Sequence, residues 1–153
     1  MAKNKKYTLT SDFDYNYTLI VIKSVLEDFR LAYFLNNKFN LQLKKEEFSL
    51  NYKNGEFSVF SFENINNNQY WSLISNKQVV DKEVKGDNYN FFEEISNTFT
   101  LINEEKKADY FLKIENNNTK PTTLIKNINS IHKVITSYEI DPNDLKSKDL
   151  LIF

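Results

Sequence analysis

Two stretches of alternating residues, with a helical segment between them, constrain the fold of this chain more than any other feature. The positions that would share one strand face recur at period two: Tyr110, Leu112 and Ile114 in the first stretch, and Val134, Thr136, Tyr138 and Ile140 in the second. Successive side chains of a strand point to opposite faces, so each stretch predicts a strand with one face against a core. With residues 122–131 as a crossover helix, the sequence predicts a strand–helix–strand unit.

An earlier strand and helix are predicted between residues 17 and 39. Residues 18–22 form an almost continuous apolar run, which is typical of a strand that is covered on both faces and lies centrally in its sheet. Ser24 and Glu27 have capping-box spacing, so the helix is expected to start at this point. The helix face that is expected to pack on the sheet consists of Leu31, Ala32, Leu35 and Phe39.

The middle of the chain contains a hairpin signal at Asn54-Gly55, between β-rich runs at residues 48–52 and 57–62. Both central residues of such a turn need positive φ, which Asn and Gly tolerate. The alternation slips within the second run, which indicates either a bulge or a strand buried on both sides. A further strand is predicted at residues 70–75.

Residues 76–90 are polar, include Gly86, and are interpreted as an irregular connection in which Val79-Val80 could extend the preceding strand. A short helical turn is expected at residues 91–95. The apolar end, residues 150–153, is expected to dock on the body of the protein.

These elements predict an α+β fold. We expect one mostly antiparallel sheet of five to seven strands with two helices on one face, ferredoxin-like with an inserted hairpin. A curved sheet closing toward a half-barrel is the alternative. The length favours a single domain, residues 1–153, with residues 1–10 as a flexible tail.

Composition bounds the possible partners. The 20 basic and 21 acidic residues give a net charge of −1, which makes general nucleic-acid binding unlikely on electrostatic grounds. No apolar run reaches the ~18 to 20 residues of a membrane span, and no apolar segment follows the basic start as in a secretory signal. The absence of Cys fits a reducing compartment, so we expect a cytoplasmic protein that does not associate with membranes.

Few residues suggest chemistry. Two Gly cannot build a phosphate-cradling loop, and with His132 as the single His and no Cys we expect no metal site, no cofactor and no catalytic constellation. His132 is expected to have a structural role, and the paired acids, such as Glu104/Glu105, to be solvated. Arg30, the single Arg, lies near aromatic residues on the less buried helix face and could bind an anion or a partner carboxylate.

Residues 102–110 read Ile-Asn-Glu-Glu-Lys-Lys-Ala-Asp-Tyr and resemble the signature of the bacterial IPExxxVDY family. Ile102, Glu104, Asp109 and Tyr110 match that signature, whereas Asn103 stands in place of Pro and Ala108 in place of Val. Residues 28–32 and 145–148 also resemble family members. The resemblance implies a small bacterial protein and carries over no catalytic residue.

We expect a structural role for this motif, with a binding site as the alternative. Asp109 would accept backbone N–H groups of the 104–108 turn, and Tyr110 would face the core or a helix and bond through its hydroxyl. The leading functional hypothesis is a non-catalytic interaction or scaffold module, with a protein partner or a homodimer. The alternatives are a small-ligand regulatory domain of unknown ligand and, less favoured, an RNA-associated protein; an enzyme ranks last.

Overall fold

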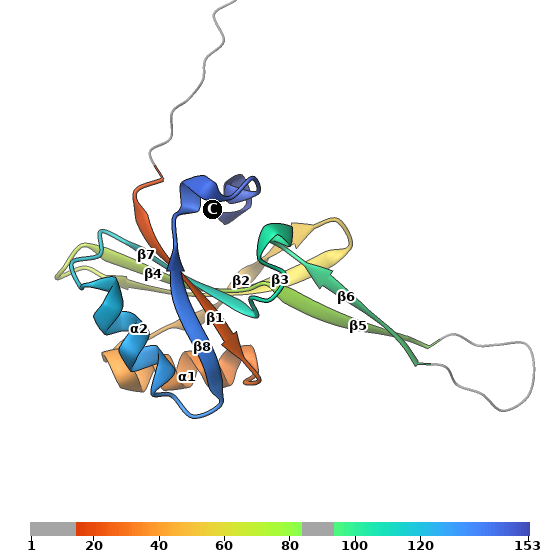
Figure 1. Ribbon diagram of the computed structural model, residues 1–153, viewed down its shortest axis with the longest axis horizontal. Helices are drawn as coiled ribbons and strands as arrows, with labels where there is room; N and C mark the ends of the chain where they lie inside the picture. The colour runs from red at the N-terminus through yellow and green to blue at the C-terminus, as the bar shows by residue number, and fades with distance from the viewer. Residues whose placement is uncertain (1–14, 84–93) are drawn as a thin grey trace, which may run out of the picture.

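The computed structural model describes residues 15–83 and 94–153 and confirms the α+β class (Figure 1). The two α-helices are α1 (Asp28–Phe39) and α2 (Pro121–Asn129). The strands are β1 (Tyr17–Ser24), β2 (Lys44–Tyr52), β3 (Gly55–Asn64), β4 (Gln69–Ser75), β5 (Lys77–Glu83), β6 (Glu94–Thr100), β7 (Tyr110–Glu115) and β8 (Val134–Ile140). In this part of the chain, no helix has the length and apolar character needed to cross a membrane.

Six strands form one open antiparallel sheet in the order β2-β3-β4-β7-β1-β8. β1 lies between β7 and β8, with Tyr17 opposite Glu115 on one side and Leu19 opposite Ile140 on the other. Because both neighbours run antiparallel to β1, β7 and β8 are parallel to each other and α2 connects them as a crossover. The expected strand–helix–strand unit is therefore present, split by β1, and the order is compatible with a ferredoxin-like arrangement.

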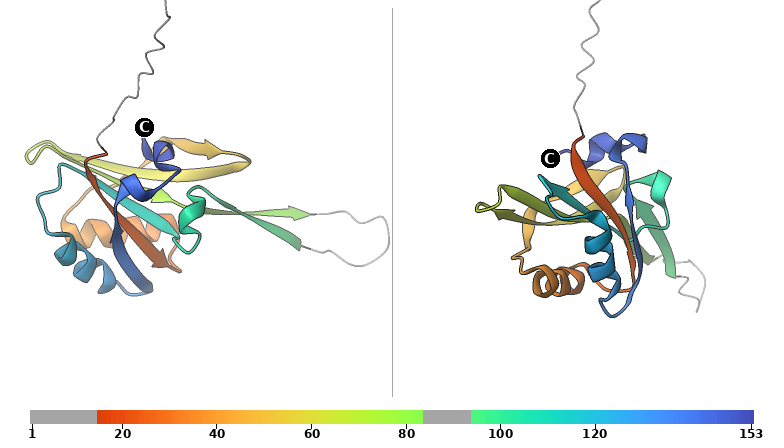
Figure 2. Two further views of the ribbon diagram at one scale, coloured as in Figure 1. Left: turned by 45° about the horizontal axis from the view of Figure 1, so that its top comes forward. Right: turned by 60° about the vertical axis from the view of Figure 1, so that its left-hand side comes forward.

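Both helices pack on the same face of the sheet, as expected, and Figure 2 shows them together on that side. Leu31, Ala32 and Leu35 of α1 are buried against strand residues such as Leu73 and Leu112, and Phe39 lies 5.7 Å, ring to ring, from Trp71. Leu124 and Ile128 supply the buried face of α2.

The opposite face of the sheet carries a second apolar cluster, covered by residues that follow β8. Leu145 and Leu151 are buried there, and a 3-10 turn (Lys148–Leu151) carries Leu151. The docking expected for residues 150–153 is therefore confirmed for Leu151 and the half-buried Leu150, whereas Ile152 and Phe153 are exposed. Lys113 of β7 is buried beneath this segment. Its Nζ donates to the Leu151 carbonyl oxygen at 3.1 Å and lies between the rings of Tyr17 and Phe153, 4.8 and 5.1 Å from their centroids.

The connection expected to be irregular after residue 76 is instead the strand β5, which pairs antiparallel with β6 in a separate two-stranded sheet. This hairpin projects away from the main sheet (Figure 1). Residues 94 and 95, expected in a helical turn, begin β6. Gly86, the rest of that turn and the expected tail at residues 1–10 lie outside the described residues.

The predicted capping box is wrong. Ser24 is the last residue of β1, paired with Val134, and α1 begins only at Asp28, where no side-chain bond caps its N-terminus. The Ser24 hydroxyl instead accepts the Leu26 N–H at 3.1 Å and donates to the Lys133 carbonyl oxygen at 3.0 Å. Strand pairing that extends through Ser24 leaves no room for the helix to start there.

The β2–β3 hairpin forms one residue earlier than predicted. Tyr52 pairs with Gly55, so the turn consists of Lys53 and Asn54, and Lys53 takes the positive φ of 54°. Gly55 is a buried strand residue without positive φ. Its requirement is space: an added Cβ would lie 2.7 Å from the Phe57 ring and 3.0 Å from the Cβ of Phe99. Of the two explanations for the slipped alternation at residues 57–62, the strand buried on both sides is the one observed, at the centre of β3. The register shift of this pair lies in β2, between Lys45 and Ser49.

Gly55→Ala should therefore destabilise the fold by overpacking, by about 1–3 kcal/mol in denaturant unfolding. Phe57 is fully buried and cannot swing away from the new methyl group. Lys53→Gly is the matched variant, because glycine is unstrained at φ 54°, and we expect unchanged or higher stability. A Gly55→Ala protein as stable as the wild type would contradict the packing explanation.

Candidate functional site

The residues that match the family signature lie in the turn between β6 and β7. A 3-10 helix (Asn103–Glu105) forms its middle, and Ile102 and Ala108 are fully buried in the cluster under the C-terminal segment. The turn thus packs on the sheet face opposite the helices. Small and apolar side chains at Ala108 and Ile102 fit this packing.

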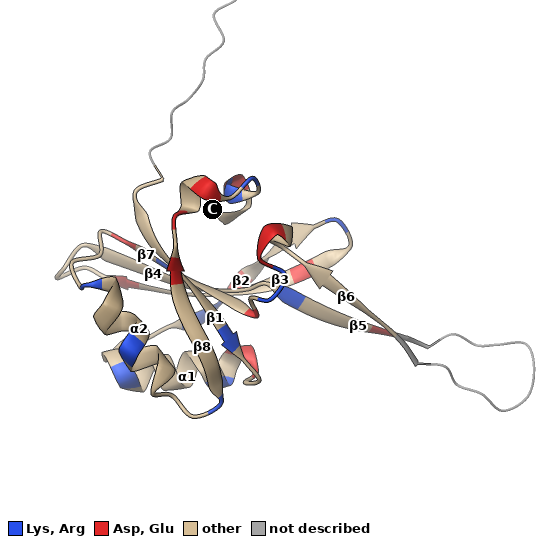
Figure 3. Cartoon of the chain, in the orientation of Figure 1, with Lys and Arg blue, Asp and Glu red and all other residues tan. Residues whose placement is uncertain are grey.

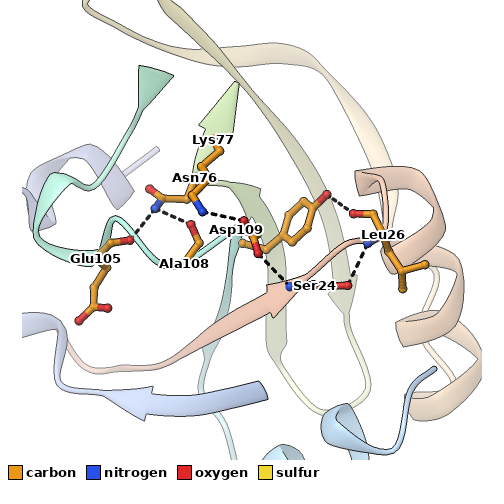
Figure 4. Close-up of polar contacts among 8 residues, drawn as sticks. Ser24, Leu26, Asn76, Lys77, Glu105, Ala108 and Asp109 are labelled. Carbon is orange, nitrogen blue, oxygen red and sulfur yellow. Dashed lines mark hydrogen bonds and ion pairs between the residues drawn. The ribbon is translucent and has the colours of Figure 1, made fainter. Parts of the chain in front are cut away.

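Asn76, between β4 and β5, holds this turn in place (Figure 4). Its side-chain nitrogen donates to the carbonyl oxygens of Glu105 and Ala108, both at 3.0 Å, and its side-chain oxygen accepts the Ile102 N–H at 2.8 Å. Its backbone N–H and carbonyl oxygen bond to Asp109 and Leu101, each at 2.9 Å. A fully buried amide therefore satisfies backbone groups that would otherwise lie unpaired inside the protein.

Asp109 does not accept N–H groups of its own turn, so that expectation is wrong. Its Oδ2 accepts the Ser24 backbone N–H at 3.0 Å, and its Oδ1 pairs with the Lys77 Nζ at 2.8 Å. Within the turn, the Glu105 and Ala108 N–H groups donate to the backbone carbonyl oxygens of Ile102 and Glu105 instead. The Asp109 carboxylate thus joins β1 and β5 to the start of β7.

Tyr110 faces the helix side of the sheet with its hydroxyl bonded, as expected. The hydroxyl donates to the Leu26 carbonyl oxygen at 2.6 Å, in the connection between β1 and α1. Burial, followed by the nearby charges of Asp28 and Asp109, raises the pKa of Tyr110, so the hydroxyl keeps its proton and remains a donor.

Glu104 and Glu105 bind separate elements. Glu104 accepts the backbone N–H and the hydroxyl of Ser147, at 2.7 and 3.0 Å, and so anchors the C-terminal segment. Burial alone would raise the pKa of Glu104, but hydrogen bonds from its own backbone and from Ser147 outweigh burial and lower it. Glu105 accepts the hydroxyl of Tyr138 on β8 at 2.7 Å. Burial and this bond raise the pKa of Tyr138 to about 12.

An apolar groove lies between α1 and the loop that joins α2 to β8, next to the β1–α1 connection. We define the α1 groove by its lining residues, which enclose about 590 Å³: Leu26, Phe29, Arg30, Tyr33, Phe34, His132 and Lys133. Two aromatic side chains of this set stand one helical turn apart and are largely exposed, Phe29 at 56% and Tyr33 at 62%. Val25, just before α1, is 70% exposed. We call Val25, Phe29 and Tyr33 the α1 patch.

The rim of the α1 groove is basic. Arg30 comes from α1, and His132 and Lys133 come from the loop between α2 and β8. Figure 3 shows Lys or Arg positions in both of these elements. The nearby carboxylate of Glu27 lies 3.8 Å from the Arg30 Nε, and both side chains are more than half exposed, so this pair contributes little. The single Arg is therefore placed beside aromatic residues, as its helix position predicted, and retains capacity for another anion.

The motif residues support the walls of the α1 groove. Asp109 and Tyr110 bond to Ser24 and Leu26, the two ends of the short connection that leads into α1. Ser24 and Val25 in turn bond to the Lys133 carbonyl oxygen, at 3.0 and 3.3 Å, which fixes the opposite wall. The motif thus lies in direct hydrogen-bonding continuity with the α1 groove.

A polar cleft of about 810 Å³ lies on the other side of Tyr110. Ser58 donates to the Asp28 carboxylate at 2.7 Å and lies 2.8 Å from the Ser75 hydroxyl, and Lys77 and Lys45 also line the cleft. The cleft lining therefore has hydroxyl groups and charges of both signs. Within the described residues, no group of three or more His, Asp or Glu side chains could hold a metal ion.

The sequence placed Arg30 near aromatic residues, but it did not identify Asn76, the polar cleft or the exposure of Val25 and Phe29. Phe29 could have been found, because it shares with Tyr33 a helix face that the core residues do not use. His132 lies in the loop after α2, as expected, but it is exposed on the groove rim. Comparisons of this chain with family models, curated proteins and solved structures found no match.

Asn76→Ala should destabilise the protein by about 3 kcal/mol or more, because it leaves three buried backbone groups unpaired. Chemical denaturation measures this loss. Asn103→Ala, in the same turn but exposed, is the control and should stay within about 0.5 kcal/mol of the wild type. Equal stabilities of the two variants would remove Asn76 as the residue that holds the turn.

Glu104 should make attachment of the C-terminal segment sensitive to acid. Its folded pKa lies below the unfolded value of about 4.3, so its contribution is complete above that pH and is lost as pH falls through the folded pKa. The Leu150 N–H bonds to the Ser147 carbonyl oxygen at 3.0 Å, so its protection from hydrogen exchange, relative to the intrinsic exchange rate at each pH, should fall below pH ~4 in the wild type. Glu104→Gln should flatten this pH dependence of protection, whereas the control Glu47→Gln, on exposed β2, should leave it unchanged. The same pH dependence in all three proteins would rule out Glu104 as the anchor of the C-terminal segment.

Proposed function

We propose that this chain is a non-catalytic interaction module that binds a partner protein through the α1 patch. The observation that carries the proposal is the exposure of Val25, Phe29 and Tyr33, at 70%, 56% and 62%, beside a groove of about 590 Å³. Exposed contiguous apolar surface with a polar rim is typical of protein interaction sites. Aromatic and Arg side chains are the types enriched at the energetic centres of such sites.

The resemblance of residues 102–110 to the IPExxxVDY signature fits this proposal. The matching residues Asp109 and Tyr110 contact the connection that carries the α1 patch rather than a bound substrate. Under the proposal, the motif keeps the patch in a fixed position, and the protein acts in the cytoplasm of a bacterium as a small scaffold.

The polar cleft favours a second candidate function, binding of a small polar ligand. Its hydroxyl groups on Ser58 and Ser75 and its cations on Lys45 and Lys77 converge on one hollow. Such convergence is typical of small-molecule sites. The first candidate has priority because Ser58 already bonds to Asp28 and Lys77 already bonds to Asp109.

The double substitution Phe29→Ala/Tyr33→Ala should abolish capture of the partner in cells without unfolding the protein. Both side chains are more than half exposed, so each change should cost within about 0.5 kcal/mol of stability. The measurement compares proteins captured by the wild type and by the variant, after photo-crosslinking from a reactive residue at position 25.

Ile65→Ala is the matched control, since Ile65 is 83% exposed in the β3–β4 loop, away from the α1 groove. It should capture the same partner as the wild type. If the double variant captures the same proteins as the Ile65→Ala control, the α1 patch is not the binding surface and the proposal fails.

A further inference from the structure

We infer that the partner segment seated in the α1 groove is an acidic amphipathic helix, which pairs a carboxylate with Arg30. This inference rests on the proposed function and specifies the chemistry of the partner. It follows from three properties of the groove: its shape, the sign of its rim and the spacing of its aromatic residues.

The shape of the α1 groove favours a partner that presents a row of side chains over one that inserts a single side chain. Phe29 and Tyr33 are four residues apart, or about 6 Å along α1. A helix laid beside α1 presents apolar side chains at the same spacing, so that its i and i+4 residues meet these two rings. Leu26, which is nearly buried, forms part of the lining between α1 and the α2–β8 loop.

The rim determines the charge of the partner. Arg30 and Lys133 face the groove from opposite walls, with His132 beside Lys133. The Glu27 carboxylate lies 3.8 Å from the Arg30 Nε, and both side chains are more than half exposed. An Asp or Glu on the incoming helix can accept from the planar Arg30 guanidinium at the edge of an apolar contact, where partial desolvation strengthens the bond.

The same charges disfavour a second copy of this chain as the occupant. In a two-fold symmetric contact the groove would meet its own surface, which brings Arg30 and Lys133 toward their equivalents. Glu27 lies 3.8 Å from Arg30 on that surface, but like-charge juxtaposition at an interface is costly. A partner of opposite charge avoids this repulsion.

The motif supplies the rigidity that this contact requires. Tyr110 and Asp109 hold the Leu26 and Ser24 backbone, and Ser24 holds the Lys133 carbonyl oxygen. The connection into α1 and the loop that carries Lys133 are therefore joined by hydrogen bonds before the helix arrives. Because the separation between the two walls is fixed, one helix can contact both walls at the same time.

The test uses a displayed library of amphipathic helical peptides, selected against the purified full-length chain. Enriched peptides should share apolar residues at i and i+4 with an adjacent Asp or Glu. For a synthetic peptide of this kind, Arg30→Glu should weaken binding about tenfold or more, and replacing the peptide's acid by Lys should restore binding to that variant. Lys133→Glu should weaken binding in the same direction.

Lys44→Glu is the charge control, because Lys44 is exposed on the edge strand β2 outside the α1 groove, and it should leave affinity unchanged. Unfolding midpoints of all variants check their fold. Selected peptides without an acidic residue, or acidic peptides insensitive to Arg30→Glu, overturn the inference, as does a selection without enrichment.

The two sets of variants distinguish a failure of the acidic-helix inference from a failure of the proposed function. If peptide binding is lost in Phe29→Ala/Tyr33→Ala but unaffected by Arg30→Glu, the α1 patch remains the interaction surface and its charge preference is wrong. If binding survives both changes, the peptide lies elsewhere and neither statement holds.

Discussion

The fold depends on one buried amide. Asn76 donates to two carbonyl oxygens and accepts one N–H of the turn at residues 101–109, and its own backbone bonds to both ends of that turn. Only a side chain with both donor and acceptor atoms can satisfy this set in a dry environment. These hydrogen bonds of Asn76 also set the positions of Glu104, Asp109 and Tyr110, because all three extend from the turn that Asn76 fixes.

From that turn the hydrogen bonds reach the elements that border the sheet. Glu104 reaches the C-terminal segment, Glu105 reaches β8, and Asp109 and Tyr110 reach the connection into α1. A structural role for the motif and a functional role for the groove are therefore compatible. Motif residues that do not touch a ligand can hold the groove residues in the positions that binding requires.

Local periodicity was sufficient to predict most strands and both helices. The covered strand predicted from the apolar run at residues 18–22 is confirmed, and strands are present at β7 and β8. The single core-facing side predicted for each is wrong: β7 is buried on both faces, and in β8 Thr136 and Tyr138 are exposed while Ser137, on the opposite face, is buried. β5 was missed because a hairpin that projects from the sheet has no core to impose apolar alternation. The turn at Lys53–Asn54 was misplaced because a glycine signal can reflect either backbone conformation or space, and here Gly55 is needed for space.

The site was less predictable because its contacts join distant residues. Asp109 lies 85 residues from Ser24 and 32 from Lys77, whereas the sequence suggested only a bond within its own turn. Asn76 has no distinguishing neighbours in an Asn-rich chain, and its role depends on which loop lies against it. The Arg30 and aromatic grouping was accessible, because helix geometry alone places these residues on one side.

The place of β1 in the sheet has a consequence for how the protein is made. Among the described strands, the partners of β1 are β7 and β8, so its first partner leaves the ribosome roughly ninety residues after it does, at an ordinary pace of about 5–20 residues per second. During that interval its Leu19–Ile22 run has no sheet to enter. A nascent chain that is arrested before β7 would expose this run, which makes it a natural target for chaperones and, in truncated products, a nucleus for aggregation.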